Sequence, residues 1–201
     1  MKFFSHLSLI LHHRHRVIHN AFHMGIFWHA LRHDISKFSP KEFFPSVHYF
    51  VGTYSPVYAE RLSNSYFSSI CQHHTKRNPH HWEYWTDFFR GRVIAKTMPY
   101  KYATEYVCDM LSASYTYNPK SFRPETTLLY FQRNAPYYYM TRATKEYVET
   151  CLTRYRDSGW KHLTKKETKA LYKELTEKYP EVELFDTLSI PEGPLPELHK
   201  K

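Results

Sequence analysis

The stretch His33-Asp34-Ile35-Ser36-Lys37-Phe38-Ser39-Pro40 follows an apolar, aromatic helical run and directly precedes a helix start. Its first two residues are potential metal ligands, because imidazole suits transition metals and carboxylate adds negative charge. Alone the pair would mean little, but it is accompanied along the chain by His13, His73, His74, His80, His81 and Asp109. These residues predict a metal site built from distant segments.

Size and composition favour one helical domain. The chain has 201 residues, enough for a hydrophobic core. Its 42% apolar and 18% aromatic residues exclude disorder for most of the length. Because there are only five glycines and few β-branched runs, we expect an all-α fold.

Charge points to the class of partner. The net charge of +9, from 28 Lys+Arg against 19 Asp+Glu, indicates an acidic ligand such as a nucleotide, an oligonucleotide or an anionic surface. A generally solvated basic surface is the alternative interpretation. No stretch approaches the roughly 20 apolar residues that span a bilayer, so no membrane partner is expected.

Cysteine usage indicates the compartment. Cys71, Cys108 and Cys151 are odd in number and widely scattered, so neither a disulfide framework nor a Cys-x-x-Cys zinc site is indicated. We therefore expect a cytoplasmic protein. The apolar start is interrupted by His6 and lacks a small-residue cleavage site, which predicts a core helix rather than a signal peptide.

The metal hypothesis requires a chain reversal. A helical pattern over residues 8–23 is interrupted at Gly25, and a second run covers residues 27–34. A straight helix would separate His13 and His33 by about 30 Å at 1.5 Å per residue. A reversal near Met24-Gly25 would bring them face to face, and the glycine permits it.

Further helices carry the remaining candidates. Residues 39–42 predict a capping box with proline at the first helical position. After Pro56, apolar residues at spacings of three and four place His74 on the core-facing stripe and His73 away from it. Asn78-Pro79 ends that helix, so His80 can meet His74 around a turn.

The last ligand candidate is an aspartate on a core-facing helix. Met98-Pro99 opens this helix, and Asp109 lies beside its inner stripe, where an unpaired charge is costly. Later helices are expected over residues 124–131, 141–155 and 164–179. An extended tail is expected beyond Pro180.

The order His13, His33-Asp34, Asp109 resembles that of the HD superfamily of all-helical metal-dependent phosphohydrolases. Members with two metals add two histidines before the final aspartate, where this chain has His74 and His80 or His81. The resemblance implies an HD-domain-like bundle of about six to eight helices over residues 1–156. Residues 157–201 would form a C-terminal helix and a proline-containing tail.

A closer resemblance is to an uncharacterised family from bacteria and their phages. Three blocks carry it, and they correspond to residues 33–43, 74–85 and 98–109. In this chain the first two read His-Asp-Ile-Ser-Lys-Phe-Ser-Pro-Lys-Glu-Phe and His-Thr-Lys-Arg-Asn-Pro-His-His-Trp-Glu-Tyr-Trp. The resemblance covers about residues 8–150.

The HD resemblance implies one or two divalent transition metal ions, with Mn, Fe, Ni, Co and Zn as candidates. The first would be held by His13, His33, Asp34 and Asp109. The second would be held by Asp34 as a bridge, with His74 and either His80 or His81. Asp34 and Lys37 would serve catalysis, Lys37 by holding a phosphate oxygen. Further substrate contacts would come from Lys76, Arg77, Asn78 and Trp82.

Each assignment has a structural alternative. With 15 histidines in the chain, some lie near one another by chance. His33-Asp34 could be a hydrogen-bonded pair at a helix end, and Lys37 a solvated lysine beside a helix cap. Trp82 could stack on a base or simply pack in the core.

Three functional hypotheses follow. The first is a phosphohydrolase that acts on a nucleotide, a cyclic nucleotide or a related phosphoester through a metal-activated water. The second is an HD-type di-iron oxygenase, and the third is a non-catalytic basic module that binds nucleotide or nucleic acid. Positive charge around the motif favours the first, with an anionic small molecule as substrate. The oligomeric state, including a homodimer, is left open, as is the role of residues 157–201.

Overall fold

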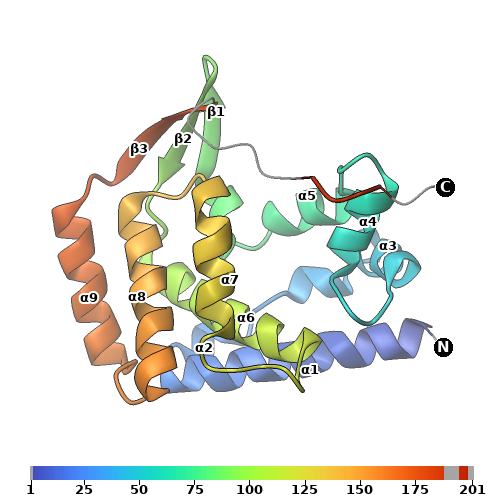
Figure 1. Cartoon of the computed structure of the whole chain (residues 1–201), viewed down its shortest axis with the longest axis horizontal. Helices are drawn as coiled ribbons and strands as arrows, with labels where there is room; N and C mark the ends of the chain where they lie inside the picture. Colours follow the sequence, from blue (N-terminus) through green and yellow to red (C-terminus); the bar gives the residue numbers. More distant parts are fainter. Residues whose placement is uncertain (1, 188–194, 199–201) are drawn as a thin grey trace.

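The computed structural model describes residues 2–187 and 195–198. This part of the chain is mostly helical, as predicted, with a small three-stranded sheet at one end (Figure 1). The all-α prediction missed that sheet. The described residues form nine α-helices, one of them only four residues long. Their bounds are α1 Lys2–His23, α2 Phe27–Ala30, α3 Pro40–Tyr49, α4 Pro56–Ser63, α5 Ser69–Thr75, α6 Tyr100–Tyr117, α7 Thr126–Asn134, α8 Arg142–Ser158 and α9 Lys165–Lys178.

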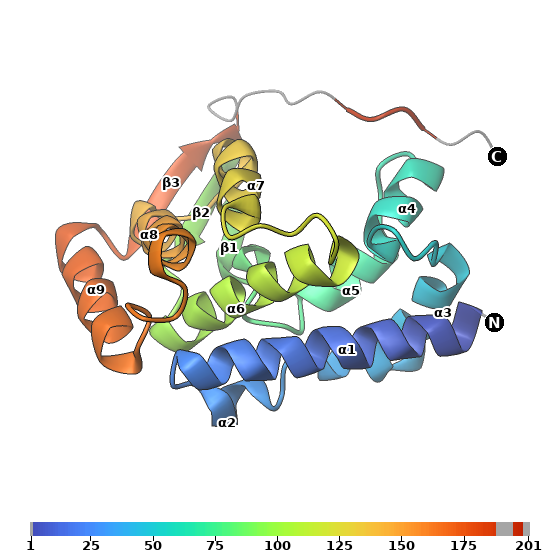
Figure 2. The same cartoon turned by 60° about the horizontal axis from the view of Figure 1, so that its bottom comes forward.

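The two longest helices, α1 and α6, lie side by side and run in opposite directions (Figure 2). The buried Asn20 amide on α1 donates to Ser112 Oγ on α6 over 2.9 Å. One turn away, the Arg16 guanidinium lies 3.4 Å from the centre of the Tyr115 ring. This helix pair is the frame against which the other elements pack.

The predicted reversal is present at Gly25. Its φ of +69° belongs to the left-handed region, and the next amide, on Ile26, donates back to Ala21 O over 2.9 Å. This is a Schellman helix end, which glycine favours. A Cβ at this position would also lie 2.6 Å from Lys165 Cβ. The run after it is shorter than predicted, because α2 ends at Ala30 and turns follow.

Two local predictions in the middle of the chain were wrong. The Ser39 side chain makes no capping hydrogen bond to α3, and Glu42 is buried in contact with other segments. The helix expected after Pro56 is split into α4 and α5, because Ser65 and Tyr66 adopt positive φ. A new cap then starts α5, where Ser68 accepts from the amide of Cys71.

The sheet has the order β1-β2-β3, and both pairings are antiparallel. Strands β1 (Thr86–Phe89) and β2 (Arg92–Lys96) form a hairpin. Its turn, Arg90-Gly91, has φ of +50° and +80°, as the two-residue hairpin turns with positive φ require. Strand β3 (Val182–Asp186) comes from the tail that we expected to be extended, and it pairs with β2.

The C-terminal region shares the core of the rest of the chain. The predicted capping box of α9 is present, with Thr164 and Glu167 bonded reciprocally. Leu171 and Leu175 on this helix belong to the same buried cluster as Val17 on α1. None of the helices in the described residues combines the length and apolarity needed to cross a membrane.

Candidate metal centre

All seven predicted metal donors converge in the interior. They come from α1, from the turn after α2, from α5, from the loop before the short 3₁₀ helix Trp82–Trp85, and from α6. Within each of two groups the donor atoms lie within 4.8 Å of one another, and Asp34 belongs to both. The groups are His13, His33, Asp34 and Asp109, and Asp34, His74, His80 and His81. These groups could hold metal ions.

The first group joins α1, α6 and the turn between α2 and α3. His13 Nε2 lies 2.9 Å from Asp109 Oδ1 and 3.4 Å from His33 Nε2. His33 Nε2 in turn lies 3.1 Å from Asp34 Oδ2. The neighbouring Arg14 guanidinium holds the turn against α1 by donating to His33 O over 2.7 Å. The reversal at Gly25 therefore places these ligands as predicted.

The second group lies on the other oxygen of the same carboxylate. Asp34 Oδ1 is 3.3 Å from His74 Nε2 and 3.4 Å from His80 Nε2. His81 completes the group, and its Nε2 is buried without a hydrogen-bond partner. The structure thus brings both His80 and His81 to the site. His73 lies outside the group, but it is not the exposed residue that its place on the helix predicted, because it is half-buried with its Nδ1 3.1 Å from Glu42 Oε2.

The backbone of Asp34 is in the left-handed helical region. Its φ of +54° and ψ of +27° are left-handed, a conformation that costs a non-glycine residue roughly 1 kcal/mol. The side chain presents Oδ2 to His33 and Oδ1 to His74. Aspartate tolerates this region better than most residues, and Ser65, Tyr66 and Arg90 adopt positive φ as well.

The donor atoms fit a cation. His80 Nε2 and His81 Nε2 are buried without a hydrogen-bond partner. The buried Asp34 carboxylate has only ion-pair contacts, with His33 and Lys37 at Oδ2 and with His74 and His80 at Oδ1. Buried polar atoms are normally hydrogen-bonded, so these two imidazole nitrogens require an explanation. The Lys37 ammonium is also close, with its Nζ 2.6 Å from Asp34 Oδ2. An imidazole and carboxylate set of this kind suits a divalent transition metal.

The two aspartates remain charged at neutral pH. Burial alone would raise the pKa of Asp34, but His33 and Lys37 hold that pKa well below its usual range. Burial would also raise the pKa of Asp109, and the hydrogen bond with His13 holds it low instead. Both groups therefore offer the deprotonated oxygens that metal binding needs.

Sequence reasoning missed Glu105, which orients the candidate ligand His33. Its Oε1 lies 2.9 Å from His33 Nδ1, and its Oε2 lies 2.8 Å from His29 Nε2. A carboxylate on Nδ1–H fixes the tautomer that leaves Nε2 free for a metal. Glu105 precedes Asp109 by four residues on α6, so the helical spacing could have revealed it.

Glu42 performs the same task for the second group. Its Oε1 lies 2.6 Å from His74 Nδ1, and its Oε2 accepts from Ser36 Oγ over 2.8 Å. The Asn78 amide donates to the same Ser36 hydroxyl over 2.7 Å. Asn78, which we expected to bind substrate, therefore serves the internal network. No local signal identifies Glu42, because His74 lies 32 residues away.

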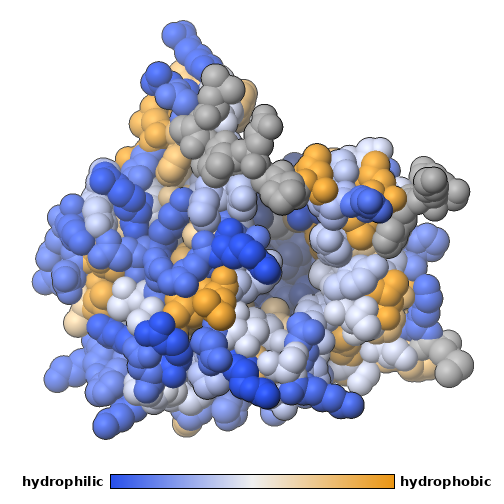
Figure 3. All heavy atoms as spheres, in the orientation of Figure 1, coloured by the Kyte–Doolittle hydropathy of each residue, from blue (hydrophilic) through white to orange (hydrophobic). Residues whose placement is uncertain are grey.

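A cavity of about 330 Å³ adjoins the donors. Its wall includes His13, His74, His81 and Asp109 from the site, together with Lys37. The surface is hollowed between α7 on one side and α4 and α5 on the other (Figure 3). Tyr130 on α7, and residues of α4 and α5, line the same cavity.

Of the predicted substrate-binding residues, only Lys37 lines this cavity. Lys76 and Arg77 are exposed outside its wall. Trp82 packs against the core, with its ring stacked on Tyr138 at 5.4 Å between centroids. The position of Trp82 in the structure therefore fits core packing, the alternative to stacking on a base.

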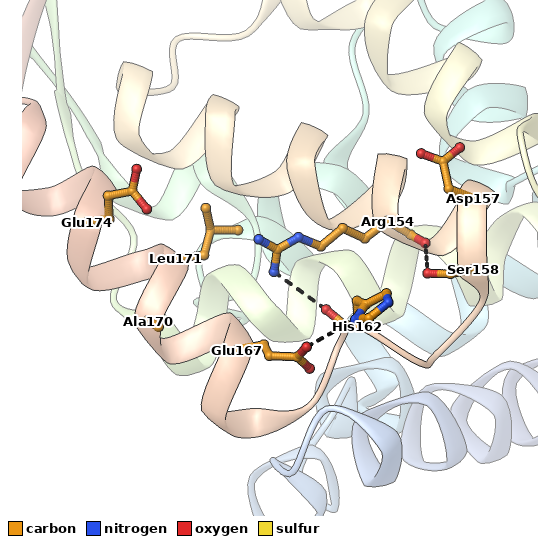
Figure 4. A pocket seen from close by; sticks show the side chains of 8 residues that line it. All are labelled: Arg154, Asp157, Ser158, His162, Glu167, Ala170, Leu171 and Glu174. Atoms are coloured by element: carbon orange, nitrogen blue, oxygen red, sulfur yellow. Dashed lines mark hydrogen bonds and ion pairs between the residues drawn. The ribbon is translucent and has the colours of Figure 1, made fainter.

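A second groove lies between α8 and α9, far along the chain from the donors (Figure 4). Several of its polar groups pair with one another. The Arg154 guanidinium donates to His162 O over 3.5 Å, and His162 Nδ1 lies 3.2 Å from Glu167 Oε1. None of the seven donors lines this groove.

Comparison with known proteins gives one family. Searches of curated proteins and of solved structures found no match. Residues 2–154 match the model of a family of unknown function, DUF5662. This range contains every donor and both orienting carboxylates. Because the match covers more than half of its length, the chain belongs to the DUF5662 family.

Proposed function

We propose that the protein is a metal-dependent phosphohydrolase that acts on a nucleotide, a cyclic nucleotide or a related phosphoester. One observation carries the proposal. The buried Asp34 carboxylate presents each of its oxygens to a separate group of donors, and both groups border one cavity. The order of these residues along the chain also resembles that of HD phosphohydrolases.

The two groups of donors that share Asp34 suit two adjacent cations. His13, His33 and Asp109 would hold the first, and His74 with His80 or His81 would hold the second, with Asp34 shared. A pair of divalent ions, when bound, supplies a water of lowered pKa and offsets charge on a phosphoryl oxygen.

The protein's own residues prepare the site. Glu105 and Glu42 hold the Nδ1 atoms of His33 and His74, so that each Nε2 faces the shared carboxylate. Lys37 places a positive charge on the cavity wall, where it would hold a phosphate oxygen. Arg61 adds a second cationic group to the wall, which suits an anionic substrate.

The test combines metal content with turnover. Metal ions in the purified protein are counted by mass spectrometry for the wild type, for Asp34→Ala and for the exposed control Asp157→Ala. The same samples are screened against nucleotides, cyclic nucleotides and cyclic dinucleotides. We expect one or two transition metal ions per chain in the wild type and the control. In Asp34→Ala we expect loss of both metal and hydrolysis.

Two other results would redirect the assignment. Bound iron with oxygen uptake and no hydrolysis would indicate the di-iron oxygenase. Absence of metal from the wild type and from the control Asp157→Ala, even after reconstitution, would refute the metal centre and leave a basic binding module for nucleotide or nucleic acid.

A further inference from the structure

His6 is a buried histidine that the proposed chemistry does not use. It lies on α1 seven residues before His13, which places it on the same face about 10.5 Å away along the axis. Only 3% of its surface is exposed, yet neither ring nitrogen has a hydrogen-bond partner. Such a group is costly to bury unless something satisfies it.

The residues around His6 pack against its ring but form no hydrogen bond with its nitrogens. The Phe43 and Phe50 rings pack on it, with centroids 5.6 and 5.1 Å away. Burial, and after it the charge of Lys37, lower the pKa of His6 to about 4. At pH 7 the ring is therefore a neutral imidazole with one N–H donor and one acceptor nitrogen.

His6 faces the same cavity as the metal donors. Along α1, the wall of this cavity runs from His6 through Leu9 and Ile10 to His13. Hydroxyl groups complete the wall, from Ser46, Ser55, Thr75, Tyr117 and Tyr130. The volume of about 330 Å³ is at the lower end of small-molecule sites, which span roughly 300–1,000 Å³. Its occupant is therefore compact and can hydrogen-bond at both ends.

We propose that His6 hydrogen-bonds a hydroxyl group of the ligand, about two helical turns from the metal donors. The ligand class is a compact, hydroxyl-bearing phosphomonoester, of the size of a sugar phosphate or a mononucleotide. A hydroxyl group both donates and accepts, so it can satisfy a neutral imidazole from either side. The inference that the ligand carries a phosphate group rests on the proposed function, whereas the role of His6 rests on the burial and the unpaired ring nitrogens of His6 itself.

Calorimetry with probes that cannot be hydrolysed tests the role of His6. The probes are methylphosphonate, which has no hydroxyl-bearing group, and the methylenephosphonate analogues of ribose 5-phosphate and of adenosine monophosphate. Full-length metal-loaded wild type is compared with His6→Leu, with His6→Asn, and with His15→Leu at an exposed position of the same helix. The two larger probes distinguish a sugar phosphate from a nucleotide.

We expect the wild type to bind at least one larger probe more tightly than methylphosphonate. His6→Leu should weaken that probe roughly tenfold, the effect of one lost hydrogen bond, and leave methylphosphonate unchanged. His6→Asn keeps a donor and an acceptor and should recover part of the loss. His15→Leu should bind as the wild type does.

Three results would overturn the inference: equal wild-type affinity for all probes, no binding of any probe, or an equal loss for all probes in His6→Leu. Circular dichroism checks that His6→Leu folds. If it does not, the same comparison is made with His6→Phe, which keeps an aromatic ring and has no hydrogen-bonding group. Unchanged binding of all probes by a folded His6→Phe would overturn the inference and indicate packing only. If the binding pattern holds but no phosphoester is hydrolysed, the proposed function fails and the role of His6 stands.

Discussion

Replacing Glu105 with glutamine tests whether this buried carboxylate orients a metal ligand. The substitution keeps the shape of the side chain and removes its charge. In the wild type, Glu105 is 4% exposed and contacts His33 Nδ1 and His29 Nε2. An amide cannot accept equally well at both ends, so the imidazole of His33 loses its fixed tautomer.

The magnitude follows from the pKa of this carboxyl. Burial alone would raise it, but the hydrogen bonds with His29 and His33 lower it from 4.5 to about 2. At about 1.4 kcal/mol per tenfold change, this stabilises the charged form by roughly 3 kcal/mol, an upper bound on what Glu105→Gln removes from folding stability. Because the pKa is lowered on folding, the contribution is present above pH 4.5 and disappears as pH falls toward 2. Loss of an orienting carboxylate also weakens metal binding, typically 10- to 100-fold.

Two assays measure these effects. Urea unfolding of the metal-free protein at pH 7 gives the stability loss, and titration with Zn²⁺ gives the affinity. The exposed Glu174→Gln serves as the control, because Glu174 lies outside the metal groups. We expect Glu105→Gln to be less stable at pH 7, to approach the wild type at the lowest accessible pH, and to bind metal more weakly. Unchanged stability together with unchanged affinity would refute the reasoning.

Further predictions concern the lysine beside the metal donors, the metal itself and the chain reversal. Lys37→Met should keep its metal, because the ammonium is not a ligand. Its rate of phosphoester hydrolysis should fall roughly 10- to 100-fold, the effect of losing one charge-assisted hydrogen bond. Loss of metal together with activity would instead indicate a structural role for Lys37. Removing metal with a chelator should lower the midpoint temperature of unfolding, because a metal ion at 100 times its Kd stabilises the folded state by about 2.7 kcal/mol. An unchanged midpoint in calorimetry would argue against a metal centre. Gly25→Ala should lower the free energy of unfolding in urea by about 2 kcal/mol or more, because of the positive φ and the contact with Lys165. Gly91→Ala has a positive φ in open space and should lower it by about 1 kcal/mol. Equal losses would show that the contact with Lys165 is unimportant.

The candidate metal donors were predictable because their signals are local in sequence. His33 and Asp34 are adjacent, and Gly25 marks the reversal that His13 needs. His74 and Asp109 lie on faces that a helical period identifies. The seven donors thus came from spacing, from residue type and from resemblance to a family.

The orienting carboxylates and the sheet depend on distant partners. Ser39 and Glu42 have the spacing of a capping box, yet Glu42 gains more from the buried His74 imidazole than from a solvated helix end. The hairpin turn at Arg90-Gly91 has a recognisable sequence, but its strands are short and β1 is mostly exposed. Propensity alone gives weak evidence for strands of this kind.

The pairing of β2 with β3 has a consequence for synthesis of the chain. Ile94 pairs with Leu184, which is 90 residues later. At about 5–20 residues per second, the ribosome delivers β3 roughly 5–18 seconds after β2. During that interval one edge of β2 has no strand beside it, and such an edge is a template for pairing with other chains. The exposed lysine and arginine at its two ends, Lys96 and Arg92, are the kind of residue that discourages such pairing before β3 arrives.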